Sequence, residues 1–276
     1  MTPPPPAVLV FAATDPSSGA GLQADILTLA SMGCHPLSVV TGITIQDTTG
    51  VEDILPLDAE WVADQARCIL EDVPVAVFKL GVLGSVEAIA AIAEIVSDYP
   101  EIPLILDPVL SSGRGDELAS EDMLAALREL IIPQATLVTP NTLEILRIAY
   151  DEAPEEDSPD FVKAAKLILD LGCEYVLLTG THSASRQVIN TLYGREGVIR
   201  SDSWERLNAS FHGSGCTLSS AIAAGLAQGL DMAEAVAEAQ EFTWQTLKDA
   251  FRLGMGQPIP DRLFWAREEP PAGDVH

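Results

Sequence analysis

A cysteine stands directly after two glycines in the stretch "FHGSGCTLSSAIAAGLAQGL", residues 211–230. Gly213 and Gly215 allow a sharp backbone turn in which successive N–H groups point at one spot. The helix expected from about residue 213 to 229 adds four unbonded N–H groups and a partial positive charge at its start. Together these features predict a hole for an anion, such as a phosphoryl group during transfer. Close packing of small residues is an equally weighted alternative.

Cys216 stands where the field of this helix favours a thiolate. A free cysteine has a pKa of about 8.5, and helix N-termini lower it. A thiolate here can accept a proton from a substrate hydroxyl, or it can attack a substrate covalently. A buried and unreactive cysteine is the alternative.

Two carboxylates, Asp107 and Glu144, follow apolar segments that we expect to be neighbouring strands. Paired carboxylates beside an anion hole predict a site where Mg²⁺, held through water, neutralises nucleotide phosphates. Glu144 also lies three residues after Asn141, which is the spacing of a capping box, and both roles can hold at once.

The elements that must position these residues alternate between short apolar runs and longer amphipathic segments. We expect strands at 7–13, 37–44, 75–81, 103–109, 135–141 and 175–180, helices at 19–33, 58–70, 85–99, 161–172, 213–229 and 231–252, and a hairpin of "QVINTLYG" and "GVIRSD" around Gly194. This alternation predicts an α/β fold with a mostly parallel central sheet and helices on both faces. We expect a flexible arm at 1–6, one domain over 7–265 and a disordered tail at 266–276.

Ligands of parallel α/β sheets bind beyond the carboxyl ends of the strands. The polar residues expected there are Asp15 with its glycine-rich turn, 44–46, 79–81, Asp107, Asn141, Glu144, 179–182 and 213–216, which together predict a binding cleft. The turn "TDPSSGAGLQAD" at 14–25 lacks the Lys-Ser/Thr ending of a Walker A loop and also misses the G-x-G-x-x-G pattern. The stretch first resembles a phosphate-binding loop, and the alternative interpretation is a closely packed structural turn.

Composition narrows the class of protein. The 276 residues carry a formal charge of −26, from 41 acidic and 15 basic residues, which argues against nucleic-acid binding. No apolar run reaches the roughly 20 residues of a membrane span, and no basic leader opens the sequence. Four scattered cysteines without CxxC spacing favour a cytoplasmic protein with free thiols. The acidic surface fits either a salty cytoplasm or an ordinary acidic protein.

Six stretches, in order over about residues 7–255, resemble the hydroxymethylpyrimidine and phosphomethylpyrimidine kinases of thiamine biosynthesis. They are "TDPSSGAGLQAD", "TGITIQDTTGV", "KLGVLGS", "LILDPV", "VTPNTLE" and "HGSGCTLSSAIAA". The resemblance implies the three-layer αβα fold of the ribokinase-like superfamily. It also implies ATP as co-substrate, Mg²⁺ as cofactor and a homodimer.

The resemblance assigns roles to individual residues. It places the anion hole on Gly213, Ser214 and Gly215 and the general base on Cys216. It implies a substrate site of Ala20, Gly21, Asp25, Gln46, Val82 and Val109, and a nucleotide and Mg²⁺ site of Asp107, Asn141, Glu144 and Thr179, with Asp107 and Glu144 acting through water. The carboxamide of Gln46 offers a donor and an acceptor that match an aminopyrimidine edge, and the Asp25 carboxylate can accept from an amine or hydroxyl.

The chain departs from the family pattern at three places. Ala13-Thr14 replaces the usual Gly-Ser, and Ala13 thereby adds a methyl group near the substrate. Val82 replaces a methionine, and the smaller side chain offsets that loss of room in the pocket. Thr179 replaces a lysine that lies near nucleotide phosphates in the family, and a hydroxyl cannot replace its charge.

The resemblance implies ATP-dependent phosphorylation of the hydroxymethyl group of 4-amino-5-hydroxymethyl-2-methylpyrimidine, and then of the monophosphate to the diphosphate. A pyridoxal or pyridoxine kinase is the first alternative, because pyridoxal shares a ring nitrogen and a hydroxymethyl arm with the pyrimidine. A non-catalytic vitamer-binding protein is the second. Thr179 favours that second alternative, whereas the retained Asp107, Glu144 and Gly-Ser-Gly-Cys run oppose it.

Overall fold

A computed structural model describes residues 3–111, 115–150, 159–180 and 186–267. Within them, the central sheet has the order β10-β9-β8-β7-β6-β5-β1-β2. Its strands are β1 (Ala7–Ala12), β2 (His35–Val40), β5 (Val75–Leu80), β6 (Leu104–Leu106), β7 (Leu137–Val138), β8 (Tyr175–Leu178), β9 (Gln187–Gly194) and β10 (Gly197–Glu205). Neighbours from β2 to β8 are parallel, and the expected hairpin adds β9 and β10 in antiparallel fashion.

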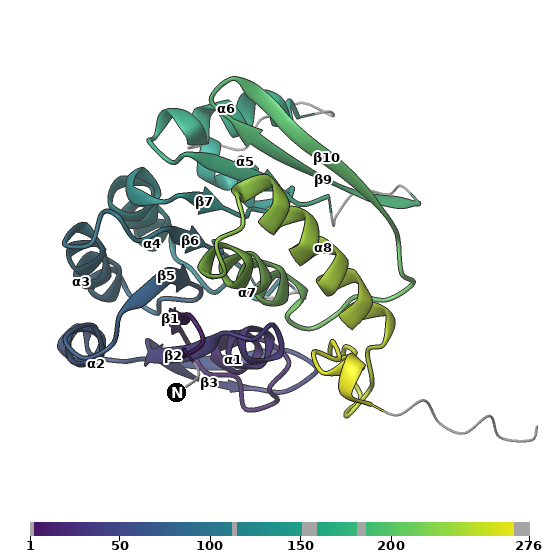
Figure 1. Cartoon of the computed structure of the whole chain (residues 1–276), viewed down its shortest axis with the longest axis horizontal. Coiled ribbons are helices and arrows are strands. Elements are labelled where there is room, and N and C mark those ends of the chain that lie inside the picture. Colours follow the sequence, from purple (N-terminus) through teal and green to yellow (C-terminus); the bar gives the residue numbers. More distant parts are fainter. Residues whose placement is uncertain (1–2, 112–114, 151–158, 181–185, 268–276) are drawn as a thin grey trace, which may run out of the picture.

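Helices cover both faces of this sheet (Figure 1). One face carries α1 (Gly21–Ser31), α7 (Ser214–Ala227) and α8 (Met232–Lys248), and the other carries α2 (Ala59–Leu70), α3 (Val86–Ser97), α4 (Glu121–Ala126), α5 (Glu144–Ala149) and α6 (Phe161–Asp170). Short helical turns lie at Leu127–Ile131, Ile132–Gln134 and Phe264–Ala266. The three-layer α/β architecture predicted from the alternation of elements is confirmed.

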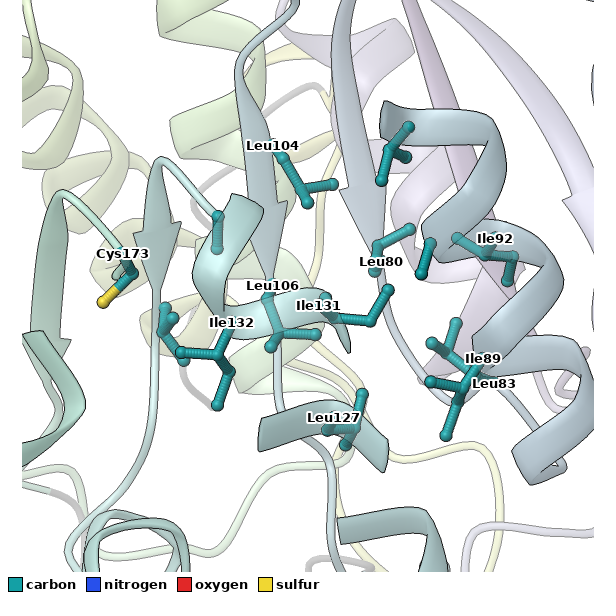
Figure 2. Close-up of a cluster of buried hydrophobic side chains, with 14 of the residues drawn as sticks. Leu80, Leu83, Ile89, Ile92, Leu104, Leu106, Leu127, Ile131, Ile132 and Cys173 are labelled. Atoms are coloured by element: carbon teal, nitrogen blue, oxygen red, sulfur yellow. The ribbon is translucent and has the colours of Figure 1, made fainter. Parts of the chain in front are cut away.

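Strand β1 shows why the sequence reads as unbroken apolar runs. Val8 and Val10 pack into the core beneath α7 and α8, whereas Leu9 and Phe11 pack into the core on the opposite face. Because both faces of the strand are buried, every side chain is apolar and no polar alternation is visible. Figure 2 shows the second core, where side chains of β5, β6, α3 and residues 127–132 converge.

The expected strand at 37–44 is wrong as a single element. Strand β2 ends at Val40, and the chain turns through Gly42 into β3 (Gly42–Gln46). Strand β3 pairs antiparallel with β4 (Val51–Pro56) in a separate two-stranded sheet. The register of β1 against β2 ends at Val40, and beyond it the chain after β1 contributes only the Thr14 N–H, which donates to the Gly42 carbonyl at 3.0 Å. Residues 42–46 therefore satisfy their backbone groups against β4.

The strands expected at 103–109 and 135–141 are shorter than predicted, so Asp107 and Asn141 belong to the loops that follow β6 and β7. The expected tail lies outside the described residues from position 268 onward, and so do residues 1–2 of the expected arm. Among the residues described, no helix is long and apolar enough to cross a lipid bilayer.

Candidate active site

A cavity of about 510 Å³ opens beyond the carboxyl ends of the parallel strands. The residues that follow β1, β5, β6, β7 and β8 line it, together with the start of α7. The residues to which the sequence analysis assigned individual roles all line this cavity: Ala20, Gly21, Asp25, Gln46, Val82, Asp107, Val109, Asn141, Glu144, Thr179, Gly213, Ser214, Gly215 and Cys216. Asp15, which was also expected in the cleft, does not line it, because its carboxylate is buried within its own turn. Their individual roles stay predictions.

Helix α7 begins differently from its neighbours. Helices α2, α3, α4, α6 and α8 each start with a serine or aspartate whose side chain accepts a hydrogen bond from the first turn. Helix α7 follows Gly213, which has φ of 82° and no side-chain cap. Since no side chain occupies its first N–H groups, they remain available to a ligand anion.

Two backbone turns meet at this point. A Cβ atom on Gly213 would lie 2.0 Å from the carbonyl oxygen of Gly19, and one on Gly19 would lie 2.1 Å from Cδ2 of His212. Only glycine at both positions permits this approach. The α7 turn is therefore packed directly against the turn at 15–20.

The turn at 15–20 uses its own amides. The Asp15 carboxylate accepts hydrogen bonds from the N–H groups of Ser17 at 2.8 Å and Ala20 at 2.7 Å, and it lies 2.9 Å from Nε2 of His212. Burial opposes ionisation, but these bonds outweigh it and lower the pKa of Asp15. An internal carboxylate thus holds these amides, which supports the packed-turn interpretation over a phosphate loop.

A buried lysine organises the charges behind the cavity. Nζ of the fully buried Lys79 lies 2.9 Å from Asp25 Oδ1 and 3.9 Å from Asp107 Oδ2. Burial favours the neutral amine, but Asp25, Cys216 and Asp107 outweigh it and raise the pKa of Lys79. Asp25 also accepts a 2.7 Å hydrogen bond from Ser220. Asp25 is therefore already engaged inside the protein, and its contact with a substrate stays a prediction.

The thiolate expected at Cys216 is wrong for the unliganded protein. The Cys216 side chain is buried, and burial raises its pKa to about 12; Lys79 opposes this shift, whereas Asp107 and Asp25 reinforce it. The desolvation of a charged sulfur exceeds the effect of the helix field. Cys216 is a neutral thiol at pH 7, and it lies beside the Asp107 carboxyl group, whose pKa burial raises and the nearby thiol lowers.

Asp107 and Glu144 provide the oxygen atoms of the site. Glu144 accepts a 2.9 Å bond from Asn141 N–H, and Asn141 Oδ1 accepts a 3.0 Å bond from Glu144 N–H, so the expected capping box is confirmed. Among the described residues, no three acidic, histidine or cysteine side chains cluster as a metal cage. Mg²⁺ in nucleotide sites needs only one or two carboxylates besides the phosphates and water. This donor set fits Mg²⁺ that arrives with a nucleotide.

Glu144 predicts a pH dependence of stability. Burial, reinforced by Asp107, raises its pKa from 4.5 to about 8, although the Asn141 N–H opposes the shift. Folding therefore favours the protonated form. The contribution to the free energy of unfolding is complete below pH 4.5 and is lost as pH rises through about 8. We expect Glu144→Gln to flatten this slope in chelator-treated protein, measured by urea unfolding between pH 5 and 8.5. An unchanged slope would contradict the prediction.

The two apolar departures lie together. The Ala13 N–H donates to the carbonyl oxygen of Val82 at 3.0 Å, and both residues line the cavity. Their proximity supports the idea that they compensate for each other.

At Gln46, Nε2 is bonded to Thr44 Oγ1 at 2.7 Å and to the Thr14 carbonyl at 3.3 Å. The orientation of this carboxamide is therefore set before a ligand binds.

Thr179 stays near the acidic pair. The Thr179 N–H donates to the Pro140 carbonyl at 3.0 Å, and Thr179 pairs with Asn141 in a single parallel β-bridge. Residues 181–185, which include His182 of the expected polar stretch, lie outside the described part of the chain.

Sequence reasoning missed many residues that line the cavity, among them Arg206, Trp204 and Trp244. Arg206 lines the cavity, and its Nη2 donates to the carbonyl of Gly180 at 3.2 Å, beside Thr179. An isolated arginine seven positions before Gly213 was a usable signal for it. Trp204 and Trp244 also line the cavity, with ring centroids 6.1 Å apart. Nothing in the local pattern marked them, because they come from different elements.

The comparisons with known proteins agree with this geometry. A family model described as phosphomethylpyrimidine kinase matches residues 15–260. A hydroxymethylpyrimidine/phosphomethylpyrimidine kinase of Streptomyces coelicolor is 36% identical over 261 residues, covering 92% of this chain and 94% of the relative.

Solved structures are similar as well. An ADP complex of Bacillus subtilis pyridoxal kinase superposes with a TM-score of 0.84 at 28% identity, covering 94% of this chain and 97% of that one. A phosphomethylpyrimidine kinase of Clostridium difficile has a TM-score of 0.75 at 31% identity, covering 88% of this chain and 99% of that one. The architecture is thus shared with vitamin kinases of two substrate classes.

Proposed function

The chain belongs to the phosphomethylpyrimidine kinase family, and from this membership we propose that it transfers the γ-phosphoryl group of ATP to 4-amino-5-hydroxymethyl-2-methylpyrimidine in thiamine biosynthesis. The same site then converts the monophosphate to the diphosphate. The observation that carries the proposal is one cavity shared by the uncapped start of α7, Cys216, the acidic pair and Gln46.

The transfer is in line, from ATP to the hydroxymethyl oxygen. The amides at the start of α7 stabilise the charge on the transferring group, and the loss of one such donor typically costs about 10²–10³ in rate. Cys216 orients the attacking hydroxyl. Because the thiol is neutral and lies beside Asp107, its sulfur takes the hydroxyl proton while its own proton passes to the Asp107 carboxylate. This relay balances the charge without a preformed thiolate.

Asp107 and Glu144 are the residues that would hold Mg²⁺ through water. When bound, the ion neutralises negative charge on the phosphates. Asn141 contributes by fixing the Glu144 carboxylate through the capping box.

Arg206 supplies a cation at the nucleotide end, where Thr179 has none. A hydrogen bond to a charged group contributes about 1.5–3 kcal/mol. We therefore expect Arg206→Met to raise the KM for ATP about tenfold or more, with the KM for the pyrimidine nearly unchanged. Initial-rate kinetics at saturating second substrate measure this. The matched control is Arg195→Met in the exposed β9–β10 turn, and equal effects of both variants would contradict the role.

Product analysis with Mg-ATP tests the proposed function. The three acceptors are the hydroxymethylpyrimidine, its monophosphate and pyridoxal, and we expect turnover of the first two to exceed that of pyridoxal. The likeness to pyridoxal kinase structures makes pyridoxal the second candidate substrate. Preferred turnover of pyridoxal would replace the proposal with that candidate. Ligand binding without ATP consumption would favour a vitamer-binding protein.

The assembly belongs to the same proposal. We expect a cytoplasmic homodimer that binds neither nucleic acid nor membranes. Exposed apolar side chains on the β3–β4 sheet, Ile43, Ile45 and Leu55, support it as the contact surface. Light scattering after size-exclusion chromatography gives the mass, and a monomer at micromolar concentration would contradict this part.

A further inference from the structure

A buried arginine lies behind the anion hole, outside every role assigned above. Arg262 is 3% exposed, and it follows α8 by 14 residues. Its Nη2 donates to the Gly19 carbonyl at 2.6 Å, and its Nε donates to Thr217 Oγ1 at 3.0 Å. Within the described residues it forms no ion pair, so the guanidinium is bonded to neutral oxygens alone. A buried cation without a carboxylate partner is costly, which argues that its bonds do more than fill space.

The Thr217 hydroxyl connects Arg262 to the anion hole. An arginine can only donate, so the hydroxyl accepts from Nε and directs its single hydrogen elsewhere. That hydrogen goes to the Gly213 carbonyl oxygen, 2.8 Å from Thr217 Oγ1. Nη2 of Arg262 also approaches the same oxygen at 3.5 Å. Arg262 therefore acts on the Gly213 carbonyl mainly through Thr217.

The Gly213 carbonyl determines where an amide of the hole points. This oxygen and the N–H of Ser214 belong to one peptide unit, which is planar and trans, so they point in opposite directions. When the Gly213 oxygen is held on the side of Arg262, the Ser214 N–H points the opposite way, from the start of α7 toward the anion hole. The same guanidinium holds the carbonyl of Gly19, where the 15–20 turn packs against Gly213.

Arg262 is itself held by two helices. The Asp261 N–H donates to the Thr246 carbonyl of α8 at 2.9 Å, and Ser31 Oγ of α1 donates to the Arg262 carbonyl at 2.6 Å. The guanidinium is thus a fixed point relative to the sheet, and the two turns are aligned against it.

We propose that Arg262 is a positioning residue for phosphoryl transfer, which through Thr217 and Gly19 aligns the anion-hole turn with the substrate turn. This proposal rests on the proposed function for the identity of the transferred group. It predicts an effect on the chemical step, because misplacing a reacting group by about 1 Å can cost about 10²-fold in rate.

Steady-state kinetics of Arg262→Met, Arg262→Lys, Thr217→Val and Thr217→Ser test the proposal. We expect Arg262→Met to lower kcat about 100-fold while the KM for ATP changes by less than about threefold. Arg262→Lys keeps the positive charge but loses the planar guanidinium with its several donors, so it recovers little of the lost kcat. Thr217→Val lowers kcat, and Thr217→Ser restores most of that loss because it keeps the hydroxyl. The double variant Arg262→Met/Thr217→Val is no slower than Arg262→Met, since both act through one contact.

The control separates positioning from folding. Arg195→Met, in the exposed β9–β10 turn, keeps the wild-type kcat. All rates are divided by the concentration of active sites, from nucleotide titration. A normal kcat per active site in Arg262→Met, or additive effects in the double variant, overturns the proposal. If Arg262→Met does not fold, equal rates of Thr217→Val and Thr217→Ser overturn it. These assays use whichever acceptor the wild-type protein phosphorylates. If that acceptor is not the hydroxymethylpyrimidine, the proposed function is refuted, but the role of Arg262 can still be tested.

Discussion

Replacing Lys79 with methionine lowers the free energy of unfolding at pH 7 by an expected amount of about 3–5 kcal/mol. Lys79 is fully buried, and its charge is opposed by Asp25 at 2.9 Å and Asp107 at 3.9 Å. Methionine matches the length of the side chain but leaves the two buried carboxyl groups without a cation. Urea unfolding followed by circular dichroism measures the loss.

A compensating variant separates charge from packing. Asp25→Asn added to Lys79→Met removes the strongest uncompensated charge, so we expect the double variant to recover part of the loss. Lys166→Met, at an exposed position of α6, is the matched control and should change little. If Lys79→Met unfolds at the same urea concentration as the control, the buried pair does not stabilise the fold.

Replacing Cys216 with alanine lowers kcat by an expected factor of at least about 100, with the KM for both substrates within about threefold of wild type. The reason is that alanine can neither orient the hydroxyl nor pass a proton to Asp107. Cys216→Ser keeps a group that can do both and retains more activity. Cys68→Ala, at an exposed cysteine, is the control. Full turnover by Cys216→Ala would rule out the relay.

The state of the thiol can be measured separately. With a pKa of about 12, Cys216 is alkylated by iodoacetamide far more slowly at pH 7.5 than the exposed Cys68. Its rate should still be rising at pH 10, because little thiolate has formed by then. Mass spectrometry of the labelled peptides distinguishes the two sites. Rapid labelling of Cys216 at neutral pH would restore the interpretation as a preformed thiolate.

The sequence by itself determined which loops share the cavity. Strand–helix alternation requires parallel strands, and parallel strands end at one edge, so Asp107, Asn141 and Thr179 were placed at a common cavity without knowledge of any contact. Gly213 likewise marked the start of α7, because few other residues tolerate its φ of 82°, whereas Gly215 lies inside the helix and is not required by the turn. These features depend on local backbone preference and on the alternation of short apolar runs with amphipathic segments.

The pairing of β3 with β4 depends on tertiary structure, because it follows from where the ladder between β1 and β2 ends. The turn from β2 into β3 was therefore invisible in a continuous apolar run.

Only the tertiary structure decided the charge states and the long-range contacts. Lys79 and Asp25 are 54 residues apart, and Arg262 reaches Gly19 across 243. The reversal at Cys216 has the same origin: a helix start is visible in the sequence, but the loss of water around the sulfur is a property of the folded core, and desolvation exceeds the helix field.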